Sequence, residues 1–254
     1  IRQNQQSTKV NFMIAGAQKA GTTALADYLR SHPQIQLPPQ KELHFFDDEE
    51  QSWPNADFDA LHNNFCDARP GQLWGDATPI TMYWERCAER IWRYNSSMRM
   101  IIILRDPVDR AYSHWAMETK RGMETLAFTE AIQIEETRAR TALPLQDRVH
   151  SYLDRSRYSE QIRRLWRWFG KCNVLILKQE DLSTIPQITL NKVYDFLSID
   201  QREVRTSILA NKGTYSEPID KSMRSQLIES MRGEIITIEK ILGWDCSDWL
   251  KVER

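Results

Sequence analysis

A glycine-bounded loop with one lysine and two hydroxyl groups is the first segment of the chain that could do chemistry. It reads GAQKAGTT over residues 16–23. Consecutive backbone N–H groups in such a loop, with the N-terminus of a following helix, form a cradle for an anion. Gly21 lets the backbone approach a phosphate, and Thr22 and Thr23 can donate to its oxygens. We predict a phosphate-type site here, and the alternative is an ordinary turn.

The lysine of this loop argues against a kinase. A nucleotide triphosphatase loop reads GxxxxGK[ST], but Thr22 follows Gly21 where that pattern has lysine, and the lysine stands inside the loop as Lys19. A Walker lysine acts beside Mg²⁺ on β- and γ-phosphates. A lysine within the loop could instead reach the bridging oxygen of a phosphosulfate and stabilise the leaving phosphate without a metal ion. A Mg²⁺-dependent small-molecule kinase is therefore the rival hypothesis rather than the main one.

The elements that position this loop alternate between strands and helices, which predicts an α/β fold with a parallel sheet. The run MRMIIIL at 98–104 is typical of a parallel strand buried on both faces. Prolines exclude a regular helix over 32–46. The other strands are expected at 9–15, within 71–78 and at 173–177, and the helices at 22–30, 57–65, 80–94, 107–120, 125–139, 157–169, 186–197 and 218–242.

Several motifs, in order along nearly the whole chain, resemble those of sulfotransferases that use 3′-phosphoadenosine 5′-phosphosulfate (PAPS), especially the glycosaminoglycan type. GAQKAGTTAL at 16–25 is similar to the family's 5′-phosphosulfate loop, and QKELHFFD at 40–47 to its KExHFFD segment. IIILRDPVDRAYSHW at 101–115 resembles the 3′-phosphate motif, and NKGTY at 211–215 the late loop over the cofactor. The resemblance implies a P-loop-like three-layer fold, a central parallel sheet flanked by helices.

The resemblance also implies which residues bind PAPS. It assigns the phosphosulfate to the first loop and the 3′-phosphate to a strand end and the following helix, and it adds late contacts. The residues are Gly16, Lys19, Ala20, Gly21, Thr22 and Thr23, then Arg105 and Ser113, then Lys212, Gly213 and Tyr215. Arg105 follows the predicted strand 98–104, so it and Ser113 could hold one phosphate together. The alternatives are that Arg105 pairs with a neighbouring aspartate, that Ser113 is solvated, and that the late loop is a plain turn.

Two residues compete for the role of the base that takes the acceptor's proton. The resemblance indicates Glu42, whose carboxylate stands beside an apolar segment, and we expect partial desolvation to raise its pKa. His44 is the rival because an unperturbed histidine pKa already suits the task. Lys41 could orient Glu42 or bind the phosphosulfate. With Lys19 offsetting the charge on the leaving phosphate, the predicted reaction is a metal-independent in-line transfer.

The acceptor is a hydroxyl group whose carrier stays open among saccharide, lipid and natural product. The segment WGDATP at 74–79 resembles the family's acceptor segment, but Ala77 stands where some glycosaminoglycan enzymes have lysine. The formal net charge of −1 likewise argues against a strongly anionic acceptor and against nucleic acid. A non-catalytic module that binds PAPS or its product 3′-phosphoadenosine 5′-phosphate (PAP) is the third hypothesis, and the presence of both Lys19 and Glu42 argues against it.

Length and composition set the remaining expectations. The 254 residues contain no linker-like segment, which favours one sulfotransferase domain over 1–254, open to having been excised from a longer protein. No apolar run approaches the roughly 18 residues of a membrane span. The four cysteines are widely spaced, which argues against a disulfide scaffold and against a zinc site. They favour a cytoplasmic location, with the Golgi lumen after loss of an anchor as the alternative.

Overall fold

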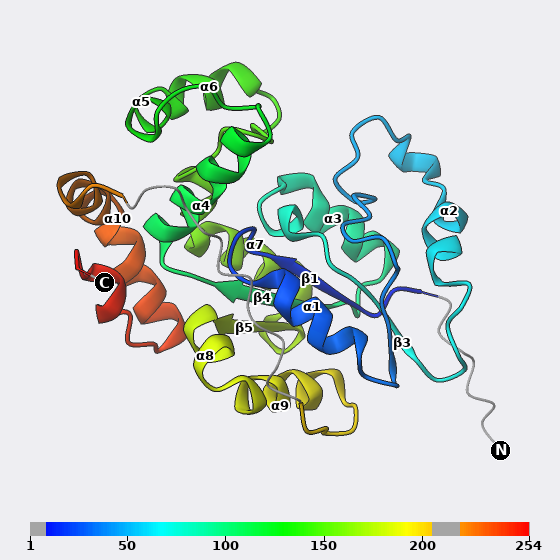
Figure 1. The fold of residues 1–254 in the computed structure, drawn as a ribbon. Coiled ribbons are helices and arrows are strands. Elements are labelled where there is room, and N and C mark those ends of the chain that lie inside the picture. The colour runs from blue at the N-terminus through cyan, green and yellow to red at the C-terminus, as the bar shows by residue number, and fades with distance from the viewer. Residues whose placement is uncertain (1–8, 205–218, 254) are drawn as a thin grey trace. The chain divides into compact units, whose positions relative to one another are not determined.

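A computed structural model describes residues 9–204 and 219–253 of the chain (Figure 1). These residues form two compact units that alternate along the sequence. Unit 1 contains residues 9–103 and 164–204, and unit 2 contains residues 104–163 and 219–253. A single domain over 1–254 therefore stays a prediction.

A five-stranded sheet forms the centre of unit 1. Its strands are β1 (Phe12–Gly16), β2 (Ile35–Gln36), β3 (Leu73–Asp76), β4 (Arg99–Leu104) and β5 (Val174–Lys178). The order is β2-β3-β1-β4-β5, and the pairings of β1 with β3, of β1 with β4 and of β2 with β3 are parallel. The predicted parallel-sheet α/β fold is confirmed. The connections after β1 and after β3 leave in opposite directions, and ligands bind beside such a reversal at the carboxyl ends of the strands.

Burial on both faces explains the composition of the central strands. All five residues of β1 are buried, and so is β4 after Arg99. Polar side chains there would lose water without gaining a partner, so only apolar residues fit. β2 has only two residues, as expected of the proline-punctuated segment that contains it.

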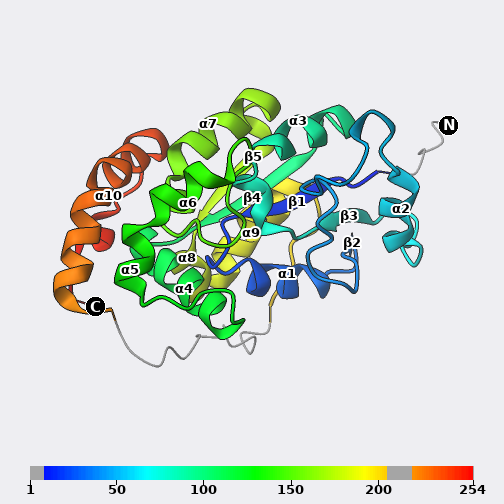
Figure 2. The ribbon, with the colours of Figure 1, turned by 90° about the horizontal axis from the view of Figure 1, so that it is seen from above.

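Helices cover both faces of this sheet (Figures 1 and 2). α1 (Thr22–Arg30) and α9 (Pro186–Leu197) lie on one face, and the ring of His32, just after α1, packs against Tyr194 of α9 at 5.0 Å. α3 (Glu85–Tyr94) lies on the other face. Unit 1 also contains α2 (Phe58–His62) and α8 (Gln179–Thr184), a short helix that the sequence pattern did not indicate.

The end of α7 (Tyr158–Phe169) belongs to unit 1 and packs beside α3. Trp168 contacts Trp92 with ring centroids 5.6 Å apart. Arg164 donates to the carbonyls of Met82 and Tyr83, each at 2.9 Å. These two residues lie at the end of a 3₁₀ segment that follows β3. Such short turns stand at Trp53–Asn55, Asn63–Phe65, Pro79–Met82, Asp154–Ser156, Lys171–Asn173 and Ser247–Leu250.

Unit 2 is built from helices around its own apolar core. Besides the start of α7 it contains α4 (Pro107–Lys120), α5 (Phe128–Gln133), α6 (Glu135–Ala142) and α10 (Lys221–Leu242). Val108, Tyr112, Phe128, Tyr152 and Leu227 are among the buried residues that form this core. Since the core joins helices distant in sequence, unit 2 depends on tertiary packing rather than on helix propensity.

The prediction of one helix over 125–139 is wrong, because α5 ends at Gln133, α6 begins at Glu135, and Ile134 between them caps both. The carboxylate of Glu135, the first residue of α6, is buried and accepts hydrogen bonds from the amides of Leu153 and Asp154 at 3.0 and 2.8 Å. Burial raises the pKa of Glu135 to about 7. This contact is long-range, so the local periodicity could not reveal the change of direction.

Candidate active site

The loop between β1 and α1 has the backbone of an anion site. Gly16 ends β1, and a side chain there would come within 2.6 Å of Met82, so only glycine fits. Lys19 and Gly21 both have left-handed backbones, with φ of 72° and 97°. The amide of Ala17 donates to the carbonyl of Ile103 in β4 at 2.8 Å. The loop is thereby held at the carboxyl ends of two adjacent strands.

The start of α1 adds the helix N-terminus to this loop. Gly21 is the N-cap and offers no side chain to the first amides of the helix. The first turn carries no acidic residue, so no carboxylate of the helix competes with an external anion for these amides. Thr22 is buried, whereas Thr23 is exposed and can turn toward a ligand. The arrangement suits a phosphate or a phosphosulfate.

Three side chains in contact, which we call the base cluster, lie on the segment after Pro39. Its members are Glu42, His44 and Asp47. His44 contacts the Glu42 carboxylate through Nε2 at 3.4 Å and hydrogen-bonds the Asp47 carboxylate through Nδ1 at 2.9 Å. Asp47 is buried, with 1% of its side chain exposed, while His44 is about half exposed at 48%. The cluster thus runs from a buried anchor to two groups that solvent or an acceptor can reach.

The charges in the base cluster separate the two candidates for the base. The hydrogen bonds of His44 with Asp47 and Glu42 raise its pKa to about 9, so its ring is protonated at neutral pH. Burial opposes ionisation of Glu42, but the hydrogen bond with His44 and the charge of Lys41 prevail and lower its pKa. The expected rise in the pKa of Glu42 is therefore wrong, because the apolar neighbours matter less than the two cations. Of the two candidates, Glu42 is therefore the one that can accept a proton at neutral pH.

Lys41 connects the base cluster to the loop that follows β1. Its Nζ donates to the hydroxyl of Thr23 at 2.6 Å and lies 3.2 Å from Oε1 of Glu42. One ammonium group thus touches both the predicted donor site and the predicted base. Of its two suggested roles, this geometry agrees with orienting Glu42.

Backbone strain marks the same residues. Within the described part of the chain, positive φ outside glycine occurs at Lys19, Glu42, His44 and Ser198. Three of these four are predicted site residues. A left-handed backbone costs a non-glycine residue about 1–3 kcal/mol and persists where the surroundings enforce it, often at functional sites. The strain therefore supports the site independently of the motifs.

A buried carboxyl group ends β3 next to β1. Asp76 is 2% exposed, and its Oδ2 accepts a hydrogen bond from the hydroxyl of Thr78 at 2.8 Å. Burial raises the pKa of Asp76 to about 6, with the hydrogen bond from Thr78 opposing the shift. Ala77, the next residue, is also buried and brings no charge to this end of β3.

The predicted pair for the 3′-phosphate lies in unit 2. Arg105 directly follows β4 and is partly exposed, and Ser113 lies on α4 with 3% exposure. The alternative of a solvated Ser113 is therefore wrong. Asp106 caps α4, because its side chain accepts hydrogen bonds from the amides of Val108 and Asp109. It also forms an ion pair with Arg224 of α10 at 3.0 Å. Arg224 contacts Asp109 as well.

Some predictions fall outside the described residues, and some site residues were missed. The late loop with Lys212, Gly213 and Tyr215 lies within 205–218, which the structure does not describe.

Asp47 was not predicted as a site residue, although its place three residues after His44, as the last residue of HFFD, was a visible signal. In the described ranges, no group of three or more His, Cys, Asp or Glu side chains could hold a metal ion.

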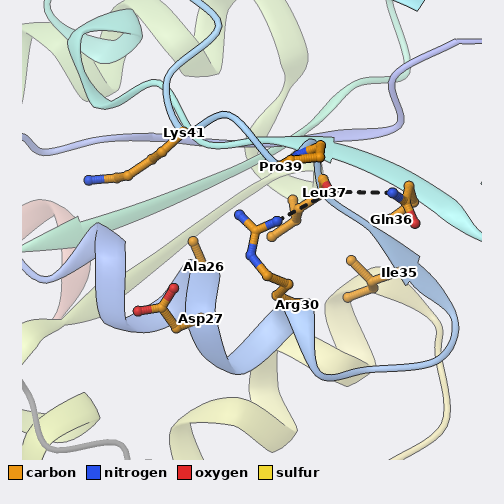
Figure 3. Close-up of a pocket in the computed structure, with 8 residues that line it drawn as sticks. All are labelled: Ala26, Asp27, Arg30, Ile35, Gln36, Leu37, Pro39 and Lys41. Carbon is orange, nitrogen blue, oxygen red and sulfur yellow. Dashed lines mark hydrogen bonds between the residues drawn. The ribbon is translucent and has the colours of Figure 1, made fainter. Parts of the chain in front are cut away.

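A pocket of about 590 Å³ opens beside Lys41 (Figure 3). One side of the pocket is α1, and the other is the segment 35–41, which starts with β2 and has Lys41 at its end. The guanidinium of Arg30 donates to the carbonyl of Pro38 at 2.8 Å and so bridges the two sides. The lining residues are Ala26, Asp27, Arg30, Ile35, Gln36, Leu37, Pro39 and Lys41.

Comparison with known proteins identifies the family. The profile of the sulfotransferase domain matches residues 9–234. The chain belongs to this family of sulfuryl-transferring enzymes, which confirms the predicted class over a kinase. A crystal structure of a sulfotransferase from Alicyclobacillus acidocaldarius superposes with a TM-score of 0.83 at 26% identity, covering 96% of this chain and 99% of that one.

Other relatives carry names that state a substrate or a bound nucleotide. Heparan sulfate glucosamine 3-O-sulfotransferase 5 of Mus musculus is 28% identical over 208 residues, which are 80% of this chain and 58% of the relative. The chain thus spans little more than half of that relative's length. Mouse sulfotransferase SULT7A1 complexed with PAP shares the fold, with a TM-score of 0.51 at 16% identity over 76% of this chain and 61% of that one.

The structure also bears on the membrane-spanning helices and the cysteines. None of the helices in the described ranges is long and apolar enough to cross a membrane. Cys66 and Cys172 are exposed free thiols, while Cys87 and Cys246 are buried. The cytoplasmic location stays a prediction.

Proposed function

We propose that this chain transfers a sulfuryl group from PAPS to a hydroxyl group of an acceptor, with Glu42 as the base. The observation that carries the proposal is the bridge from Thr23 through Lys41 to Glu42, because it brings an anion-binding loop and a deprotonated carboxylate to one place. A kinase would need Mg²⁺ ligands, whereas this site combines the loop with a base and a cation. A purely binding module would have no use for the strained base cluster.

The residues of unit 1 fit a phosphosulfate. The helix N-terminus faces no carboxylate of its own first turn, the backbone around Lys19 and Gly21 is left-handed, and lysines 19 and 41 supply positive charge. PAPS, when bound, would supply the sulfuryl group and PAP as the leaving group. A chain of the same fold, mouse SULT7A1, is known in complex with PAP. We assign the 3′-phosphate to Arg105 and Ser113 of unit 2. This phosphate is the group that PAP has and ADP lacks.

The roles of the chain's own residues follow from their charges. Glu42 accepts the hydroxyl proton as the acceptor oxygen bonds to sulfur and becomes more acidic. Lys19 and the first amides of α1 stabilise the negative charge that develops on the phosphate oxygen as its bond to sulfur breaks. His44 remains protonated and orients Glu42, while Asp47 holds His44. No residue forms a covalent intermediate.

For the acceptor we propose a saccharide hydroxyl, because the curated relative is named as acting on heparan sulfate glucosamine. The pocket beside Lys41 lies within the usual size range of small-ligand sites, and we assign to it a neighbouring sugar unit. The charged residues of its lining are Asp27, Arg30 and Lys41, which are of both signs, so a weakly charged saccharide suits it better than a highly sulfated one. Lipid and natural-product hydroxyls are the alternatives to screen.

Calorimetric titration with PAP and with ADP, both in EDTA, tests the donor. We expect PAP to bind at least about tenfold more tightly, since the 3′-phosphate gains charge-assisted hydrogen bonds that ADP lacks. Arg105→Ala should remove this preference while the melting temperature stays that of the wild type. Equal affinities in the wild type, or tighter binding of ADP, would contradict the assignment of Arg105 and Ser113 and favour a kinase.

A further inference from the structure

Arg90, in the middle of α3, reaches out of its helix to the segment that carries the base cluster. Its Nη1 donates to the carbonyl of Phe46 at 2.9 Å and to that of Asp48 at 3.4 Å. Its Nη2 pairs with Glu49 at 2.8 Å, and the guanidinium lies 4.2 Å from the ring centre of Trp53. Arg90 is only 9% exposed, so this one side chain binds four groups with little competition from water.

The two carbonyls that Arg90 binds flank Asp47, the buried anchor of the base cluster. Asp47 orients His44, and His44 contacts Glu42. The guanidinium therefore holds the peptide unit just before Asp47 and the peptide unit after Asp48, and so fixes the backbone on both sides of the residue that orients the cluster. A planar group with several donors suits this task, because it can bind two carbonyls and a carboxylate at once.

The base cluster needs such support from outside. Residues 40–50 contain no helix or strand, and Glu42 and His44 have left-handed backbones with φ of 62° and 53°. The half-exposed ring of His44 is not confined by core packing. A strained and partly solvated conformation relaxes unless neighbouring contacts enforce it. Arg90 provides such contacts at the end of the segment where the cluster is buried.

We propose that Arg90 is a positioning residue for the acceptor base, acting through the carbonyls of Phe46 and Asp48 on Asp47, His44 and Glu42. The inference rests on the proposed role of Glu42 and extends it to a residue on another element of the fold. Arg86 offers a matched control. It pairs with the same Glu49 carboxylate at 2.7 Å, yet it is 52% exposed, and among the bonds described it makes none to the backbone of the segment.

The test compares Arg90→Met, Arg90→Lys and Arg86→Met in the full chain. NMR titration of the His44 ring, assigned with His44→Gln, reports directly on the cluster and needs no acceptor. In Arg90→Met we expect the His44 pKa to fall from about 9 toward its ordinary value of 6.5, while the PAP affinity stays within twofold. Turnover should fall by about 10- to 100-fold, as expected of a misplaced base. Arg86→Met should change none of the three.

Arg90→Lys keeps the charge but cannot bind both carbonyls and the carboxylate together, so it should show the same changes to a smaller degree. It is also the deciding variant if Arg90→Met does not fold. A folded Arg90→Lys or Arg90→Met with the wild-type His44 titration and turnover would overturn the inference. A changed His44 titration in a chain whose wild type transfers no sulfuryl group would uphold the positioning role and reject the proposed function instead.

Discussion

The two halves of the candidate site in unit 1 are built in different ways. The donor half, residues 16–23, is a loop between a strand and a helix, and its binding groups are mainly backbone amides set by regular elements. The acceptor half, residues 41–47, has no regular structure and is held by side-chain contacts with Asp47 and Arg90. Anion binding in this site therefore follows from local backbone geometry, whereas placing the base requires a network from elsewhere in the fold.

The largest expected effect separates the two halves at Glu42. Glu42→Gln keeps the shape of the side chain but removes the proton acceptor, so we expect transfer to fall by about 10³-fold or more, within the range of general-base catalysis and lost positioning. The PAP affinity should remain within about twofold, because the donor half is unchanged. Calorimetry and a transfer assay on the same preparation give both values. Retained transfer, with loss in His44→Ala, would make His44 the base.

Removing the cation of the donor half should have the next largest effect. We expect Lys19→Ala to lower turnover by about 100-fold or more, the scale of losing one group that stabilises developing charge. The effect should appear in kcat rather than in the acceptor's KM, since Lys19 belongs to the donor half. Steady-state kinetics with varied acceptor separate the two. Near-normal turnover would exclude Lys19 from the mechanism.

The acceptor half should reveal itself in the pH profile. Because the pKa of Glu42 is lowered from 4.5 and the pKa of His44 is raised to about 9, we expect turnover to stay level from about pH 6 to about pH 8 and to fall to half near pH 9. Asp47→Asn removes the main hydrogen bond that raises the His44 pKa, so the alkaline limb should move toward neutral pH and turnover should fall by about tenfold. A wild-type loss of activity near pH 6.5 would contradict the base cluster.

The smallest effect concerns stability. The pKa of His44 is raised in the folded chain above its ordinary value of 6.5, so its ion pairs stabilise the fold fully below about pH 6.5. This contribution is lost as the pH rises through about 9. We expect the melting temperatures of the wild type and of His44→Gln to differ by a small amount at pH 6 and to converge at pH 10. An equal difference at both values would show that the ring is not charged in the fold.

Much of the fold and of the donor half could be predicted from the sequence, because both depend on local patterns. The bounds of α1, α4 and α9 match the prediction to the residue, and Gly21 stands at the left-handed position that the loop requires. The break at Ile134 and the short α8 were missed. The lowered pKa of Glu42 was also missed, because its sign depends on where the side chains of Lys41 and His44 lie in three dimensions. Arg90 carries no motif that marks it.

Transfer of labelled sulfuryl from PAPS by the wild-type chain in EDTA tests the proposed activity itself. The acceptors should include a heparan sulfate precursor, a neutral oligosaccharide, a glycolipid and a small natural-product alcohol. We expect a labelled product and stoichiometric release of PAP with at least one of them, with no loss of rate in EDTA. Tight PAP binding without any transfer across this panel would contradict it and favour a module that only binds the nucleotide.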